Sequence, residues 1–466
     1  MTENIKSLWK NFYADVPAQL EKIGSVKSVA TAFNTNIDAV LKIDGVRIQK
    51  LARQVGLVRE DLADTKTHII TPKDVVRGII KCFKQGIAEE WLCENPETYQ
   101  WMRQNLGYDR LQMGGQGGII ANLMSVVGVQ KVLAHTNAHP ALQAAQFLPT
   151  DNLFGFDENG VLQKASAINR TAEDAMIHWI LEFDGGDVFE VCGETIRCPK
   201  SNRFIATYDP ANSVLKTDDN FIRYLTEKGY DYLFLSGYSN LSAVRDGVAK
   251  VMKSAEQIKK WHLANPNGII HLELASTQDI DVRRAIIEYI APLVDSAGMN
   301  ERETLDTLHI VDADMYNRVC NQELTSPLLF ESIIKLKQII KIPRIQLHMF
   351  GLYVTVQDKN FKILPEENKK GMMLAATLAA SKCATGNLNT KNNLLWAHGL
   401  EIADKSLAAL RQLSVYLNDE TLLSSGVAEY AGYDVIAVPT ILIEKPLTLV
   451  GMGDTISSVS LVGAME

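Results

Sequence analysis

Residues 446–458 read PLTLVGMGDTISS and contain a β-type apolar run, a turn with two glycines and the start of a helix of small residues. We expect a strand over 446–450, followed by the turn and the helix. Gly451 and Gly453 allow backbone N–H groups to approach an anion, and a helix N-terminus adds partial positive charge. Asp454 is placed to accept a proton from a hydroxyl group. The segment favours phosphoryl transfer to an alcohol, with an ordinary turn capped by Asp454 as the alternative.

The composition is typical of a globular protein with a sizeable core. Of the 466 residues, 46% are hydrophobic and 22% are charged. The formal net charge of -8 argues against nucleic acid or an anionic membrane as a partner, so we expect small-molecule ligands. The cysteines are scattered without zinc-like spacing, and we find no signal peptide or membrane-spanning run. These features predict a cytoplasmic protein with reduced thiols.

The order of the predicted elements indicates an α/β fold with a doubly wound, mainly parallel sheet flanked by helices. Its apolar strands are predicted over residues 28–33, 232–237, 268–274 and 308–312. A mainly helical stretch with a helix over 81–91 precedes residue 112, and β-type segments occupy 168–208. We interpret both stretches as insertions. The predicted large domain comprises residues 1–39, 112–165 and 208–466, and a smaller α+β lid domain comprises 40–111 and 166–207.

Two polar segments are candidate ligand sites. Asn36 and Asp38 follow the first predicted strand, where open α/β sheets bind ligands, although an Asx-rich turn is the alternative. Residues 113–122 read MGGQGGIIAN and predict that the backbone approaches a sugar or phosphate beside Gly115 and Gln116. Close packing of a helix on a sheet is the other interpretation. The spacing matches neither the dinucleotide fingerprint nor the P-loop.

Five short motifs occur in one order over nearly the whole chain: NTNID at 34–38, GGQGG at 114–118, HLE at 271–273, NERE at 300–303 and GMGD at 451–454. This set resembles the ADP-dependent glucokinases and phosphofructokinases, a mainly archaeal family of sugar kinases in the ribokinase-like superfamily. The resemblance implies a ribokinase-like fold and transfer of the β-phosphate of ADP to glucose, fructose 6-phosphate or both, in a modified glycolysis. The alternatives are an ATP-dependent ribokinase-like small-molecule kinase and a non-catalytic relative that binds sugar or nucleotide.

The resemblance places the chemistry on the last motif and on two acidic motifs. Asp454 is implied as the catalytic base, and Gly451 and Gly453 as the anion hole for the transferred group. Glu273 and Glu303 are implied to order Mg²⁺ and its waters. Phosphoryl transfer demands mainly positioning and charge stabilisation, so this set of groups is chemically sufficient.

The nucleotide partners implied by the resemblance are ADP as the donor and AMP as the product. Asn300 is implied to lie near the phosphates. The resemblance points to His348, Tyr353 and Val438 for the adenine base, although such residues in apolar strands are also typical of a protein core. We expect a monomer that binds neither nucleic acid nor membrane.

Sugar binding is implied for residues on the matching motifs, namely Asn36, Asp38, Glu90, Gly115, Gln116, His178 and Arg203. Glu90 resembles the carboxylate of the glucokinase branch, and Glu89 is the alternative if the register differs by one residue. The predicted lid is expected to close on the sugar and to exclude water.

Basic residues of the second insertion suit the phosphate of fructose 6-phosphate. Arg203, helped by Arg197 or Lys200, supplies the cations, although an exposed basic strand edge is the alternative interpretation. Asp184 stands where the phosphofructokinase branch is expected to have a lysine. We therefore expect a bifunctional kinase that accepts both sugars.

Overall fold

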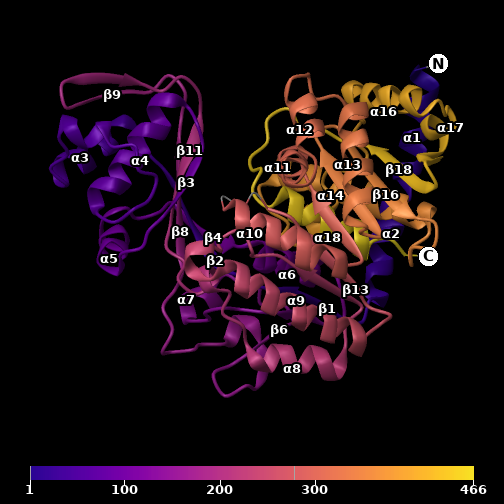
Figure 1. Ribbon diagram of the computed structural model, residues 1–466, viewed down its shortest axis with the longest axis horizontal. Coiled ribbons are helices and arrows are strands. Elements are labelled where there is room, and N and C mark those ends of the chain that lie inside the picture. Colours follow the sequence, from indigo (N-terminus) through magenta and orange to yellow (C-terminus); the bar gives the residue numbers. More distant parts are fainter. Residues whose placement is uncertain (1, 276, 278, 466) are drawn as a thin grey trace.

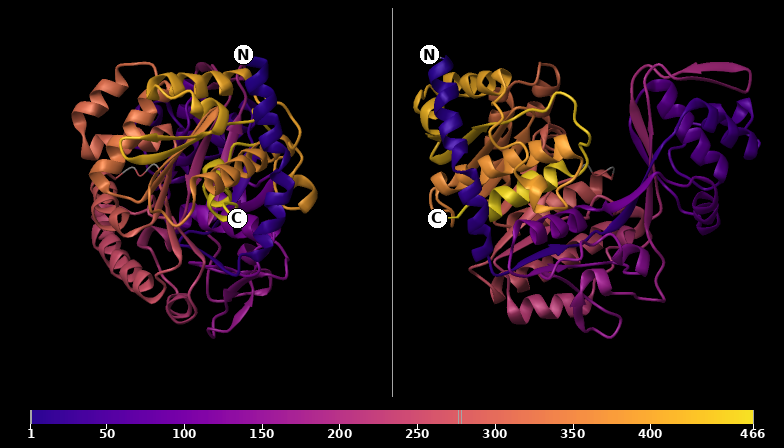
Figure 2. Two further views of the ribbon diagram at one scale, coloured as in Figure 1. Left: turned by 90° about the vertical axis from the view of Figure 1, so that its right-hand side faces the viewer. Right: turned by 180° about the vertical axis from the view of Figure 1, so that it is seen from behind.

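The strands of the protein belong to one large sheet, one small sheet and a separate hairpin (Figure 1). The structure is a computed structural model that describes residues 2–275, 277 and 279–465. Within those residues the large sheet has 11 strands in the order β17-β18-β16-β15-β14-β13-β12-β1-β5-β6-β7. The small sheet has five, in the order β3-β11-β8-β2-β4. We call the large sheet with its helices the large part of the molecule, and the small sheet with its helices and the hairpin the small part. The two chain ends lie on the side of the large part that faces away from the small part (Figures 1 and 2).

The large sheet is parallel from β6 through β1 to β15, and its outer strands are antiparallel. Its inner strands are buried along their length, as expected where helices cover both faces, although β13 and β15 also carry buried polar residues such as His271, Glu273 and Arg344. This confirms the predicted doubly wound sheet. The strands are β1 (Val29–Ala32), β5 (Val132–Ala134), β6 (Leu153–Phe156), β7 (Leu162–Lys164), β12 (Tyr232–Leu235), β13 (Ile269–Glu273), β14 (Ser296–Met299), β15 (Arg344–Met349), β16 (Leu352–Asp358), β17 (Val427–Tyr430) and β18 (Tyr433–Pro439).

Helices α6, α14 and α18 pack together beside the large sheet, whereas α11 and α13 contact strands β14, β15 and β16. None of the helices in the described part of the chain is long and apolar enough to cross a membrane. The helices that accompany the large sheet are α1 (Thr2–Ala14), α2 (Val16–Lys22), α6 (Gln116–Val127), α7 (Ala141–Ala144), α8 (Asp219–Lys228), α9 (Gly247–Ala264), α10 (Ile280–Ala285), α11 (Glu301–Val311), α12 (Ala313–Cys320), α13 (Ser326–Ile340), α14 (Pro365–Thr385), α15 (Lys391–Leu394), α16 (Asp404–Leu417), α17 (Thr421–Ser425) and α18 (Met452–Val462).

The small sheet has a hydrophobic core of its own, which includes Ile37, Ile79, Phe83, Trp179 and Phe204. The core lies on the face covered by helices, and the other face carries polar side chains. The strands and helices of this part are β2 (Asn36–Lys42), β3 (Glu89–Leu92), β4 (Arg110–Gly114), β8 (Ile177–Phe183), β11 (Asn202–Thr207), α3 (Gly45–Gln54), α4 (Pro72–Gln85) and α5 (Pro96–Asn105), with the hairpin β9 (Val188–Val191) and β10 (Glu194–Arg197).

Strands β2 and β4 lie across the predicted boundaries at residues 39 and 111, and both pair within the small sheet. The division of the chain into a large domain and a lid stays a prediction. Both segments lie where the small part meets the large part in Figures 1 and 2.

Three predicted elements are wrong. No strand forms over 446–450, where the N–H of Leu447 donates to the carbonyl of Cys383 in α14 instead of to a neighbouring strand. Residues 308–312 end helix α11, which begins at a capping box between Asn300 and Glu303. The helix predicted over 81–91 ends at Gln85, because Gly86 adopts a left-handed conformation that terminates α4.

A buried histidine fixes the loop between the two sheets. His135 follows β5, and its Nδ1 donates to the carbonyl of Phe33 at 3.1 Å, while its Nε2 accepts from the N–H of Asp218 at 3.0 Å. A neutral imidazole with the proton on Nδ1 satisfies both bonds. Burial lowers the pKa of His135 to about 4.

We predict that acid weakens the protein through His135. The native pKa lies below that of an unfolded histidine, about 6.5, so the unfolded chain binds more protons as the pH falls from about 6.5 to 4. The free energy of unfolding then falls by up to about 1.4 kcal/mol per pH unit for this group. Denaturant unfolding at pH 7, 6 and 5 measures the slope. The variant His135→Gln is expected to have a smaller slope, and an unchanged slope would contradict the assignment.

Candidate active site

The glycine turn lies at the start of helix α18, beside the carboxyl ends of β13 and β15. Gly451 has a left-handed conformation, with φ of 64°, that suits glycine. A Cβ atom on Gly453 would lie 3.0 Å from both Glu273 Oε1 and His348 Nε2, so a side chain there would crowd both groups. The turn therefore presents bare backbone at the N-terminus of a helix, which is a site suited to an anion.

Asp454 is buried in the first turn of α18. Burial raises the pKa of its carboxyl group to about 7, and the negative charge of Glu273 adds to this. The charge of Lys382 and a hydrogen bond from Gln116 act in the opposite direction and lower the pKa. The GGQGG and GMGD motifs, distant in the sequence, therefore meet at this carboxylate. A base whose pKa is close to neutrality is well matched to proton transfer.

Glu273 and Glu303 add two more carboxylates to the same place. Glu273 ends strand β13, and burial raises its pKa. Burial also raises the pKa of Glu303, to about 8, with further contributions from Glu273 and Asp454. Glu303 Oε2 accepts from the N–H of Asn300 at 2.9 Å, which explains why the NxxE spacing begins a helix. Burial is the main cause of all three raised pKa values, and like charge adds to it for Asp454 and Glu303.

This concentration of negative charge suits a divalent cation, which would neutralise it. Among the described residues, no group of three or more His, Cys, Asp or Glu forms a metal cage. Mg²⁺ commonly binds through one or two carboxylates, water and substrate phosphates rather than through a full protein cage. Glu273 and Glu303 fit that mode of binding.

Lys382 is a site residue that the sequence interpretation missed. It lies near the end of α14, where its Nζ donates to the carbonyl of Gly451 at 2.9 Å and to Thr455 Oγ1 at 3.2 Å. Burial lowers the pKa of Lys382 to about 8, although Asp454 counteracts the shift. The available signal was a lone lysine after the apolar run that starts at Gly371.

The polar face of the small sheet gathers the predicted sugar-binding residues of the first motif. Asn36 Nδ2 donates to Asp38 Oδ1 at 2.9 Å, and both side chains are buried. Burial raises the pKa of Asp38 to about 6. The charge of Glu90 also raises this pKa, whereas the charge of His178 lowers it. Asp38 lies opposite His178 in the pairing of β2 with β8, so the two share this face.

His178 is oriented by a second buried residue that the sequence interpretation missed. Its Nε2 lies 3.0 Å from Asp209 Oδ2. Burial alone would lower the pKa of His178, but the hydrogen bond and charge of Asp209 raise it overall. Asp209 also accepts from the side chains of Asn212 and Asn240. Its position two residues after β11 was the available signal.

The structure separates Glu89 from Glu90. Glu90 Oε1 accepts from Thr207 Oγ1 at 2.6 Å, and its charge acts on both Asp38 and His178. Glu89 pairs instead with Lys81 of α4 at 2.7 Å. Glu90 therefore belongs to the polar face, and Glu89 does not.

The basic residues of the second insertion do not all share one sheet. Arg203 lies in β11, opposite Glu182 of β8, and no ion pair of Arg203 occurs within the described residues. Arg197 lies in the β9–β10 hairpin, where its Nη1 donates to the carbonyl of Gly186 at 3.4 Å. Asp184 pairs with Lys42 at 2.6 Å. Arg203 is the cation on the small sheet nearest in sequence to Thr207.

The glycines of GGQGG serve close packing of α6 against the loop that enters β2. A Cβ atom on Gly115 would lie 2.8 Å from the carbonyl of Asn34 and from Asn36 Oδ1. One on Gly114 would collide with Asn36 and Asp38. The packing interpretation therefore accounts for these glycines, and Gln116 between them reaches Asp454.

The three residues predicted for adenine are cross-strand neighbours. His348 lies opposite Tyr353, which lies opposite Val438, and all three are buried. His348 Nε2 is 3.7 Å from Glu273 Oε1. The structure brings the three together within the sheet, and their contact with adenine stays a prediction.

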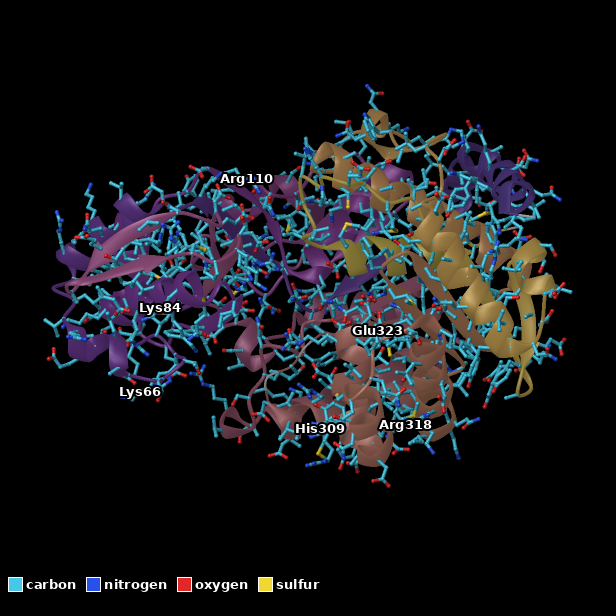
Figure 3. The ribbon with its side chains drawn as sticks, turned by 90° about the horizontal axis from the view of Figure 1, so that it is seen from above. Lys66, Lys84, Arg110, His309, Arg318 and Glu323 are labelled. Atoms are coloured by element: carbon cyan, nitrogen blue, oxygen red, sulfur yellow. The ribbon has the colours of Figure 1, made fainter. Side chains whose placement is uncertain are left out.

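A groove of about 430 Å³ lies beside the glycine turn. Its lining includes Arg110, Gln112, Ile119, Lys382 and Thr455. Arg110 lies between the small and large parts of the molecule in Figure 3, whereas Lys66 and Lys84 lie farther out on the small part. The groove thus joins the edge of the small sheet to the N-terminus of α18.

The chain is similar to known proteins along nearly its whole length. The family profile described as "ADP-specific Phosphofructokinase/Glucokinase conserved region" matches residues 27–463. The ADP-specific phosphofructokinase of Methanosarcina acetivorans is 28% identical, over 94% of this chain and 93% of that protein. The ADP-dependent glucose/glucosamine kinase of Pyrococcus abyssi is 31% identical, over 97% of each.

A solved structure, described as an ADP-dependent kinase complex with fructose-6-phosphate and ADPβS, is 27% identical. It superposes with a TM-score of 0.80 and covers 98% of this chain and 97% of that one. The likeness extends over both sheets, because the matched share includes nearly the whole chain. The protein belongs to the family of ADP-specific phosphofructokinases and glucokinases.

Proposed function

We propose that this protein transfers the β-phosphate of ADP to a hydroxyl group of glucose or fructose 6-phosphate and releases AMP. The observation that carries the proposal is the position of Asp454 in the first turn of α18, next to Gln116, Lys382 and Glu273. A base, a helix N-terminus and acidic side chains for a metal converge at one place. This set supports transfer of a phosphoryl group, which requires positioning and charge stabilisation rather than covalent catalysis.

In the proposed reaction, ionised Asp454 accepts the proton of the sugar hydroxyl. The hydroxyl oxygen attacks the β-phosphorus, and AMP is the leaving group. The backbone of Gly451 and Gly453 and the N-terminus of α18 stabilise the charge on the transferred group. Lys382 holds the turn through the Gly451 carbonyl. Glu273 and Glu303 would hold Mg²⁺, which neutralises and orients the phosphates when bound.

Acceptor binding is assigned to the polar face of the small sheet. Asp38, His178 and Glu90 offer hydrogen-bond acceptors and a donor for sugar hydroxyls, and Arg203 suits a phosphate group. A relative named for glucose and a solved structure with fructose-6-phosphate support an enzyme that accepts both. We propose that the small sheet and its helices form a lid domain of a cytoplasmic monomer and close over the sugar to exclude water.

The proposal is tested by initial rates with ADP or ATP as the donor. Turnover is expected with ADP, Mg²⁺ and either sugar, and a preference for ATP would overturn the proposal. Asp454→Asn keeps the shape of the side chain but removes the base, so kcat is expected to fall by about 10²–10⁴-fold. Calorimetry is expected to give unchanged ADP binding. Normal turnover of Asp454→Asn would contradict its role.

Acceptor preference is expected to follow two residues of the small sheet. Glu90→Gln loses a charged acceptor and is expected to lower kcat/KM for glucose by about tenfold or more, with a smaller effect on fructose 6-phosphate. Arg203→Met is expected to lower kcat/KM for fructose 6-phosphate more than kcat/KM for glucose.

Matched controls lie close to both residues in the sequence. Glu89→Gln changes the neighbouring carboxylate, which pairs with Lys81 away from the polar face, and Arg197→Met removes a cation of the hairpin. Both are expected to leave the ratio of the two kcat/KM values unchanged. Equal losses on both sugars for Glu90→Gln would refute its role in preference.

A further inference from the structure

A fully buried arginine lies in the large sheet without an acidic partner. Arg344 begins strand β15 and is 0% exposed. Its Nη2 donates to Gln346 Oε1 at 3.0 Å and to Asn368 Oδ1 at 3.1 Å. No carboxylate of the described residues lies within 4.0 Å of its guanidinium group. Because a buried charge is unfavourable unless it is compensated, this cation requires an explanation.

A chain of hydrogen bonds connects Arg344 to Glu273. Arg344 Nη1 donates to Ser296 Oγ at 2.9 Å, and Ser296 Oγ lies 3.0 Å from His271 Nδ1. His271 Nε2 lies 3.1 Å from Glu273 Oε2. The chain crosses three adjacent strands, β15, β14 and β13, which are paired in parallel.

The direction of these bonds follows when Glu273 is ionised, because a carboxylate can only accept. Arginine has donors only, so Ser296 Oγ accepts from Arg344 and its own proton is available for His271 Nδ1. A neutral His271 that accepts at Nδ1 carries its proton on Nε2 and donates it to the Glu273 carboxylate. Along this chain each donor points from the buried cation toward Glu273, while Arg344 Nη2 donates to Gln346 and Asn368.

We propose that Arg344 and Ser296 are positioning residues that act through His271 to hold Glu273 in the orientation that binds the divalent cation. This inference rests on the proposed function, in which Glu273 is a metal-binding carboxylate. Hydrogen-bond partners of the residues at a metal site fix the orientation of the imidazole ring and of the carboxylate, and their loss weakens metal binding. Arg344 also supplies positive charge that favours the ionised form of Glu273.

The packing around Glu273 supports a fixed orientation. A Cβ atom on Gly298 of β14 would collide with Glu273 Oε2, Ser457 Oγ and His271. Glycine at this position therefore lets the carboxylate and the imidazole lie against the backbone of the next strand. Ser460 of α18 also donates to Gln346, a partner of Arg344, so the same network contacts the helix of the proposed base.

The experiment measures metal binding rather than turnover. Mn²⁺ is titrated into the full-length protein with saturating ADP and no sugar, and the EPR signal of free Mn²⁺ gives the dissociation constant. Ser296→Ala, which removes one hydroxyl group, and Arg344→Met are each expected to weaken Mn²⁺ binding by about tenfold to a hundredfold. Affinity for ADP without metal is expected to stay within twofold of the wild type.

Arg170→Met is the matched control for loss of a buried arginine. Arg170 donates to the carbonyl of Phe156 and pairs with Asp218, so it belongs to a different network. This variant is expected to lower thermal stability and to leave the Mn²⁺ dissociation constant unchanged. If Arg344→Met does not fold, Ser296→Ala alone decides the test.

The outcomes separate the two proposals. Wild-type protein that binds no Mn²⁺ in the presence of ADP would refute the metal role of Glu273 and with it this inference. If Ser296→Ala and Arg344→Met bind Mn²⁺ with the same dissociation constant as the wild type, the proposed function stays in place and the positioning role is overturned. An equal loss in Arg170→Met would assign the effect to general destabilisation and would also overturn it.

Discussion

The burial of three neighbouring carboxylates is the constraint on which the rest of the site depends. Burial raises the pKa values of Asp454, Glu273 and Glu303, and the charge of Glu273 raises those of Asp454 and Glu303 further. The fold surrounds them with groups that act in the opposite direction, including Lys382, the start of α18 and the chain from Arg344. A bound divalent cation completes this balance in the proposed reaction, so binding of the metal and ionisation of the base favour each other.

The second requirement is contact between two sheets that fold around separate cores. The glycines at 114 and 115 allow α6 to approach the loop that leads into β2, and Gln116 reaches the base from that junction. Asn36 and Asp38 begin the small sheet a few residues later. The groups for the acceptor and those for the donor are therefore adjacent, although they belong to different sheets.

Sequence patterns predicted the parts of the structure that depend on local chemistry. The doubly wound sheet followed from apolar runs, whereas the capping box of Asn300 and Glu303 was not predicted, although their spacing encodes it. The strands predicted over 446–450 and 308–312 were wrong because a contact with α14 and a helix cap, rather than local β propensity, decided those segments. Lys382 and Asp209 were missed because each acts through a tertiary contact with a distant segment.

The separate core of the small sheet has a consequence for how such enzymes diversify. Side chains on its polar face contribute little to that core, since alternate residues of each strand point away from it. If this face binds the acceptor, as proposed, its side chains can be substituted to suit another sugar while the core of the small sheet and the glycine turn at α18 stay unchanged.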